Sequence, residues 1–175
     1  LRLQGIQIMP IVGKEQLRPN LNALVLSPGF SQITSLSIVR DANANPVAAF
    51  QSVRDALRAA NLPAPDHPLK IVGGKPRVAV LILPGENSPG MLEDLCLKAV
   101  AEDPAMFCVE QYFKCLEQKR LSLPDNMSKA KVQVFLASRP RADLRLGEAA
   151  EKGYWPWDHD AFQMVKDFIN MLVNV

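Results

Sequence analysis

The most constraining feature of this sequence is a continuous apolar run from Val78 to Leu83, rich in β-branched residues and ended by Pro84-Gly85. A short run bounded by turn residues is typical of a strand. Because no polar residue alternates with the apolar ones, this strand is expected to be covered on both faces. Strands buried in this way occur in parallel sheets with helices packed on them, so the run predicts an α/β fold.

Other segments have weaker strand patterns. The segment from Thr34 to Arg40 alternates apolar and polar residues and stops at Asp41. The run Ile6–Val12 lies between two glycines and predicts a buried strand, and Leu69–Val72 is compatible with a short one. Together with the apolar run, these segments predict a mostly parallel central sheet of about four strands.

Helices are predicted between and after these strands. Asn45-Pro46 and Asp103-Pro104 each combine a favoured N-cap residue with proline at the first helical position. The expected helices cover Lys14–Leu26, Pro46 to Asn61, the residues after Ser88-Pro89, those after Pro104, Ser128–Ser138, Asp143–Lys152 and those from Asp160 onward. The segment 128–138 also fits a strand, and a helix is favoured. The strand–helix order predicts one domain, with helices on both faces of the sheet.

The charge and cysteine content exclude several classes of protein. With 20 basic and 18 acidic residues among 175, the chain lacks the signature of a dedicated nucleic-acid binder, although it could still grip a few phosphates locally. Three cysteines without a C-x-x-C motif favour a reducing compartment, and we expect a cytoplasmic protein. No apolar run is long enough to cross a bilayer, so no membrane association is expected.

Side chains with oxygen donors follow the predicted strands. Asp41 and Asn43 come after the alternating strand, and Glu93 and Asp94 open the helix after the apolar strand. Because ligands bind beyond the carboxyl ends of strands in open parallel sheets, these side chains would converge if the strands are neighbours. Carboxylate and amide oxygens suit Mg²⁺ or Mn²⁺, which take one or two carboxylates with waters and a substrate phosphate.

A structural role is the alternative for the same four residues. Asp41 and Asn43 would build the turn before Asn45, because Asp and Asn bond their own backbone in turns. Glu93 and Asp94 would be first-turn acids that complement the helix dipole. From spacing alone, the structural role is favoured.

Five motifs resemble those of a known family, and this resemblance favours a metal-binding role over a purely structural one. They are Leu26-Ser27-Pro28-Gly29-Phe30, Ile38-Val39-Arg40-Asp41-Ala42, Gly90-Met91-Leu92-Glu93-Asp94-Leu95, Leu136-Ala137-Ser138 and Gly153-Tyr154-Trp155-Pro156-Trp157. Through them, residues 24–168 resemble a family of uncharacterised bacterial proteins related to the Toprim fold. The resemblance implies a Toprim-like domain, similar to those of primases, topoisomerases and overcoming-lysogenization-type nucleases.

The resemblance implies a metal site. Toprim domains hold metal through acidic motifs, and Asp41 and Asn43 match the Asp-x-Asp positions, with Glu93 or Asp94 at the later one. Metal held there stabilises charge on a phosphodiester during reaction. The related nucleases also carry a downstream lysine, and Lys129 is the residue expected to act on the phosphate, with Lys131 as the other match.

The chain departs from the family pattern in two ways. Asn43 replaces the second Asp and brings one less negative charge. No Glu-Gly-x-x-Asp motif is present, and Ile6–Val12 resembles the second strand of the family, so residues 1–175 are expected to form a single domain that lacks its N-terminal strand. Two hypotheses follow: Mg²⁺-dependent, nuclease-like phosphodiester chemistry, or a catalytically degenerate module that binds a protein, nucleic acid or nucleotide partner.

Smaller features are expected to be structural. His67 and His159 are predicted to have surface or capping roles, because neither has a partner at metal-ligand spacing. Cys108 and Cys115 are expected to be buried small apolar residues. The basic group around Arg139 and the two lysines is either a solvated face, which is favoured, or a phosphate contact.

Overall fold

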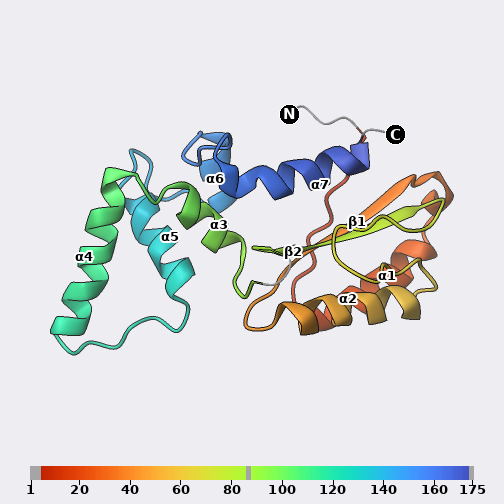
Figure 1. Ribbon diagram of the computed structural model, residues 1–175, viewed down its shortest axis with the longest axis horizontal. Coiled ribbons are helices and arrows are strands. Elements are labelled where there is room, and N and C mark those ends of the chain that lie inside the picture. Colours follow the sequence, from red (N-terminus) through yellow and green to blue (C-terminus); the bar gives the residue numbers. More distant parts are fainter. Residues whose placement is uncertain (1–4, 86–87, 174–175) are drawn as a thin grey trace. The chain divides into compact units, whose positions relative to one another are not determined.

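The computed structural model describes residues 5–85 and 88–173 (Figure 1). They form two compact units, which we name the sheet unit (residues 1–90 and 165–175) and the helical unit (residues 91–164). Within the described residues, the chain contains seven α-helices and a two-stranded parallel sheet. The α/β class predicted from the apolar run is therefore confirmed.

The sheet consists of β1 (Ser35–Asp41) and β2 (Arg77–Leu83), which pair in parallel from Ser35 opposite Arg77 to Asp41 opposite Leu83. Every residue of β2 after Arg77 is buried, as expected of a strand covered on both faces. The two strands are connected through α2 (Pro46–Ala59). This arrangement places the carboxyl ends of both strands at one edge of the sheet.

Two helices cover one face of this sheet. α1 (Leu17–Val25) follows a 3-10 turn at Lys14–Gln16 and lies beside α2 (Figure 1). Alternate residues of the strands point to these helices and close a core. Its central members are Leu21, Ile38, Val53, Leu57, Val78, Val80 and Ile82, each less than 9% exposed. Each large side chain buried in this way stabilises the fold by about 1.5–3 kcal/mol.

The prediction of about four strands is wrong for two segments. Residues 6–12 are irregular, and Ile6, Ile8 and Val12 are 47%, 86% and 89% exposed. An apolar run becomes a strand only where a neighbour supplies hydrogen-bond partners. Among the described residues the sheet consists of β1 and β2 and does not include this segment. Leu69 has φ 64°, which breaks an extended backbone, and Val72 makes a single antiparallel bridge to Val78. That residues 1–175 form a single domain lacking its N-terminal strand stays a prediction.

The helical unit contains four complete helices. They are α3 (Leu92–Ala99), α4 (Pro104–Gln118), α5 (Met127–Ala137) and α6 (Leu146–Glu151). A 3-10 turn at Asp160–Phe162 leads into α7 (Gln163–Val173), whose residues from Val165 onward are assigned to the sheet unit. The start of α4 and the ambiguous segment 128–138 are helical as predicted, whereas α3 begins at Leu92, later than expected.

The core of the helical unit lies around α5. α3 and α4 both pack against this helix. At its centre Phe135 stacks on Trp155, with ring centroids 5.3 Å apart and planes inclined by 21°. The Trp155 indole N–H donates to the Leu146 carbonyl oxygen at 3.1 Å, so this buried ring has its polar atom satisfied. Trp155, which is 1% exposed, thereby packs the segment after α6 onto this core.

Candidate functional site

The first group of predicted residues lies in the strand-end loop, residues 41–45, at the carboxyl end of β1. The backbone N–H of Ala42 donates to the Leu83 carbonyl and extends the pairing with β2 by one residue, at 2.8 Å. Asn43 and Gly90 then exchange two backbone hydrogen bonds of 2.7 Å each. Asn43 has φ 50°, a left-handed conformation that Asn tolerates better than most residues. The loop is therefore fixed at the edge of the sheet where ligands bind in parallel folds.

The side chains of this loop have separate roles. Asn45 is the N-cap of α2, because its Oδ1 accepts from the Ala48 backbone N–H at 2.9 Å. Asn43 is exposed and Asp41 is half-buried at the end of β1. The backbone of Asn43 forms the turn before Asn45. Because Asn45 caps the helix, the capping of α2 requires neither Asp41 nor the Asn43 amide.

The second group, Glu93 and Asp94, lies in the first turn of α3 in the helical unit. Asp94 Oδ2 accepts from the Met91 backbone N–H at 2.7 Å, and its Oδ1 accepts from the Ser128 hydroxyl at 2.5 Å. Asp94 therefore caps α3 and ties this helix to α5. Burial, and then the negative charge of Glu93 one turn away, raise the pKa of the Cys96 thiol to about 12. These hydrogen bonds give Asp94 a structural role within its own unit.

The two candidate lysines differ in their surroundings. Lys129 is the third residue of α5, where its backbone N–H donates to Asn126 Oδ1 at 2.9 Å and its side chain is exposed. The Lys131 ammonium is 2.6 Å from Glu110 Oε1, an ion pair between α5 and α4. Lys129 is therefore the more accessible of the two for a phosphate.

The predicted site residues are divided between the two units. Asp41 and Asn43 belong to the sheet unit, whereas Glu93, Asp94 and Lys129 belong to the helical unit. Across residues 5–85 and 88–173, no cluster of three or more His, Cys, Asp or Glu residues is placed to hold a metal ion. The convergence of the two groups on one cation stays a prediction.

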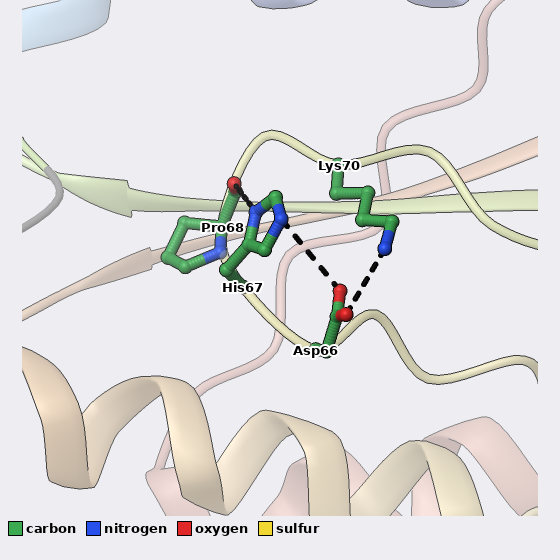
Figure 2. A network of polar contacts seen from close by, with 4 residues as sticks. All are labelled: Asp66, His67, Pro68 and Lys70. Atoms are coloured by element: carbon green, nitrogen blue, oxygen red, sulfur yellow. Dashed lines mark hydrogen bonds and ion pairs between the residues drawn. The ribbon is translucent and has the colours of Figure 1, made fainter.

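His67 belongs to a polar network on the surface of the sheet unit. Figure 2 shows Asp66 between His67 and Lys70, on the loop that follows α2. Asp66 accepts from the Lys70 ammonium at 3.0 Å and lies 3.8 Å from His67 Nε2. The Lys70 hydrogen bond lowers the pKa of Asp66. All three side chains are exposed, which confirms the surface role predicted for His67.

The helical unit also contains a pocket that sequence reasoning missed. It has a volume of about 440 Å³ and is lined by Ala99, Val100, Glu102, Asp103, Arg139, Pro140, Gly153, Tyr154, Pro156 and His159. Asp103 caps α4 by accepting from the Ala105 backbone N–H at 2.9 Å. Arg139 Nη2 lies 2.8 Å from the same Asp103 oxygen, and this guanidinium lowers the pKa of the Asp103 carboxyl. The cap signal of Asp103 was visible in the sequence, but its pairing with Arg139 was not.

The helical unit also contains His159 and the two cysteines that were predicted to be buried. His159 Nδ1 accepts from the Ala161 backbone N–H at 3.0 Å, so the predicted capping role is confirmed. The burial predicted for Cys108 and Cys115 is wrong, because both thiols are exposed on the outer side of α4. Only the inner face of α4, with Met106, Val109 and Phe113, is buried.

Comparison with known proteins identifies a family without an assigned activity. Neither the curated proteins nor the solved structures include a significant match. None of the helices among the described residues is long and apolar enough to cross a membrane. A family model does match residues 4–174, almost the whole chain, under the description "Protein of unknown function (DUF3226)". That description names no activity and no relation to Toprim domains, so the Toprim relation stays a prediction. The extent of the match shows that the chain belongs to the DUF3226 family.

Proposed function

We propose that the strand-end loop of the sheet unit binds a divalent cation, Mg²⁺ or Mn²⁺, and that the protein uses it in phosphodiester chemistry of a nuclease-like, Toprim-related kind. The observation that carries this proposal is the position of Asp41 and Asn43 at the carboxyl end of a parallel strand. Asn45 caps the following helix, and the paired backbone bonds to Gly90 fix the loop between them.

The chemistry of the donors supports a hard cation. Asp41 offers a carboxylate and Asn43 an amide oxygen, and both are ligands that Mg²⁺ accepts. Mg²⁺ usually keeps several waters and needs only one or two protein carboxylates when a substrate phosphate completes its shell. The same loop begins α2, 14 residues long, and a helix N-terminus favours an anionic group. Bound metal would act as a Lewis acid toward the phosphodiester.

Calorimetric titration of the chain with Mn²⁺ tests the metal site. Wild type is expected to bind, and Asp41→Ala is expected to lose this binding because it removes the carboxylate. Asp55→Ala is the matched control, since Asp55 is an exposed acid of the same unit in the third turn of α2. Absence of Mn²⁺ binding by wild type, or equal binding by Asp41→Ala, would contradict the proposal.

The reaction class requires a separate assay. Hydrolysis of bis(p-nitrophenyl) phosphate in the presence of Mn²⁺ is expected for wild type and not for Asp41→Ala. Lys129→Ala and Glu93→Gln test the roles predicted from the Toprim resemblance, and both are expected to lower the rate of hydrolysis. Lys114→Ala, at another exposed lysine of the helical unit, is the control for the lysine.

The second candidate function is a binding module without catalysis. The observation that favours it is Asn43, whose neutral amide supplies less charge to a metal than a second carboxylate would. Under this alternative Mn²⁺ binds and no phosphodiester is hydrolysed. The pair of measurements therefore distinguishes a metal-dependent enzyme from a metal-dependent binding protein.

A further inference from the structure

Arg139 has an unusual polar environment, because two of its guanidinium nitrogens lack hydrogen-bond partners. Its guanidinium lies over the Phe135 ring, 4.1 Å from the centroid, and only 22% of its side chain is exposed. Nε and Nη2 are shielded from solvent and have no hydrogen-bond acceptor. Nη2 is close to Asp103, but its N–H is not aligned with the oxygen. A buried donor without an acceptor lowers the stability of the folded state, so such donors in a native protein usually have a functional or structural reason.

The structure holds the guanidinium in place from two sides. The Phe135 ring supports one face by a cation–π contact, and Asp103 anchors its edge. Asp103 is itself held by the Ala105 backbone N–H at the start of α4. Arg139 is therefore a partly buried cation held between Phe135 and Asp103, and it lines the pocket of about 440 Å³.

Two further donors line the same pocket. Because His159 Nδ1 accepts from the Ala161 backbone, the proton of the neutral ring sits on Nε2. The Tyr154 hydroxyl oxygen accepts from the Arg141 backbone N–H at 3.3 Å, which leaves the hydroxyl hydrogen to be donated. Pro140 and Pro156 contribute apolar walls. The lining thus combines a guanidinium, an imidazole N–H and a phenolic O–H.

We propose that this pocket binds the oxyanion group of a small molecule, a carboxylate or a phosphate monoester, with Arg139 as the principal donor and His159 and Tyr154 as supporting donors. A turn of the guanidinium edge toward the pocket gives Nε–H and Nη2–H the two acceptor oxygens that they lack. This paired geometry is the one by which arginine binds carboxylates and phosphates. The volume matches pockets for small organic molecules. The proposal does not depend on a metal in the strand-end loop.

Glu102 distinguishes an oxyanion from other ligands. The charges of Arg139 and Asp103 cancel, so the exposed Glu102 is the remaining acid of the lining. Its carboxylate repels an anion but would attract a cation or accept from the N–H groups of a heterocyclic base. Glu102→Gln should therefore strengthen oxyanion binding by about threefold, whereas it would weaken binding of a cation or a base.

The test is titration of the full ¹⁵N-labelled chain with inorganic phosphate, acetate and adenosine 5′-monophosphate, followed by NMR. The backbone amide signals of the pocket lining are the readout in every variant. In wild type the Arg139 Nε–H signal also reports on the guanidinium, because its burial slows exchange with water. We expect saturable shifts, weakened about tenfold or more in Arg139→Lys, which keeps the charge but loses the paired donors. Arg145→Lys, an exposed arginine of the same unit, is the control and should change nothing.

The two arms of the titration separate the sources of the oxyanion. Preference for phosphate and the nucleotide assigns a phosphate monoester, and preference for acetate assigns a carboxylate. Absence of saturable binding by all three probes would overturn the proposal. Weaker binding in Glu102→Gln would also overturn it, and this variant keeps the test decisive if Arg139→Lys fails to fold.

Discussion

The two units use their acidic residues in different ways. In the sheet unit a separate residue, Asn45, caps the helix after β1, so that capping requires no carboxylate. In the helical unit the acids are the caps: Asp94 holds the start of α3 and Asp103 the start of α4. An acid near a helix start is therefore a candidate ligand only where another residue caps the helix. The predictions below test this distinction, from the largest expected effect to the smallest.

The largest effect is expected from Asp94→Ala. This change leaves the Met91 N–H and the Ser128 hydroxyl without their acceptor, and losing a cap and a second charged hydrogen bond costs about 2 kcal/mol of unfolding free energy. Asp55→Ala should cost less, because Asp55 is an exposed acid in the interior of α2 and not a cap. Urea unfolding followed by tryptophan fluorescence measures the first effect, since Trp155 and Trp157 both lie in the helical unit. Equal losses in the two variants would contradict the distinction.

The second prediction concerns the thiol on the inner face of α3. Cys96 is fully buried and its pKa is raised to about 12, so it should react with a thiol reagent only when the helical unit opens. Cys108 and Cys115 are exposed and should react at once. If Asp94 holds α3 closed, Asp94→Ala speeds the Cys96 reaction by up to about thirtyfold, the factor that corresponds to 2 kcal/mol. An equal rate of Cys96 modification in wild type and Asp94→Ala would show that packing alone, and not the Asp94 cap, keeps α3 in place.

Local signals in the sequence predicted much of the fold. The apolar run gave β2, and the pairs Asn45-Pro46 and Asp103-Pro104 gave the starts of α2 and α4, because a cap and a proline act within one turn. The run Ile6–Val12 was wrongly predicted to be a strand. Strand formation depends on pairing with a neighbouring strand, and the residues of the run do not show whether such a neighbour exists. The number of strands was overestimated for this reason.

The candidate sites differ in the same way. Asp41 and Asn43 could be placed because a strand end is a local feature, and the structure finds them there. The contact between Arg139 and Asp103 could not, because it arises from the packing of α4 against α5. Asp103 signalled a cap, and Arg139 was grouped with a solvated basic patch. Neither pattern indicated a half-buried ion pair beside a pocket.

The third prediction uses the pH dependence of Asp103. Its pKa is lowered by Arg139 in the folded state, below the usual value of 3.8, so the folded protein favours the charged form. The stabilisation is complete above about pH 4 and is lost as pH falls through the folded pKa. Stability of the helical unit should fall less steeply below pH 4 in Asp103→Asn, measured by urea midpoints from fluorescence. Asp66→Asn is the control, because the Asp66 network is exposed and lies in the sheet unit.

The fourth prediction removes the cap of the sheet unit. Asn45→Ala should lower the unfolding free energy by about 1 kcal/mol, because the Ala48 N–H loses its acceptor. Far-UV circular dichroism should record this loss, since α2 belongs to the sheet unit, which contains no tryptophan. Asn45→Asp preserves the cap and should be close to wild type. A loss in Asn45→Asp as large as that in Asn45→Ala would show that another property of Asn45 matters.

The smallest effect on stability is expected at Asn43, where the backbone and the side chain can be separated. Asn43→Gly keeps the left-handed conformation at φ 50° without strain, so it should change the unfolding free energy by only a few tenths of a kcal/mol. Asn43→Ala should cost about 1 kcal/mol, because alanine tolerates this conformation less well. If the amide oxygen is a ligand, Asn43→Gly weakens Mn²⁺ binding although the fold is intact, and Asn43→Asp strengthens it by adding a carboxylate beside Asp41. Mn²⁺ affinities that are equal in wild type, Asn43→Gly and Asn43→Asp would show that Asn43 serves only the turn, and the distinction between the two units would then rest on Asp41 alone.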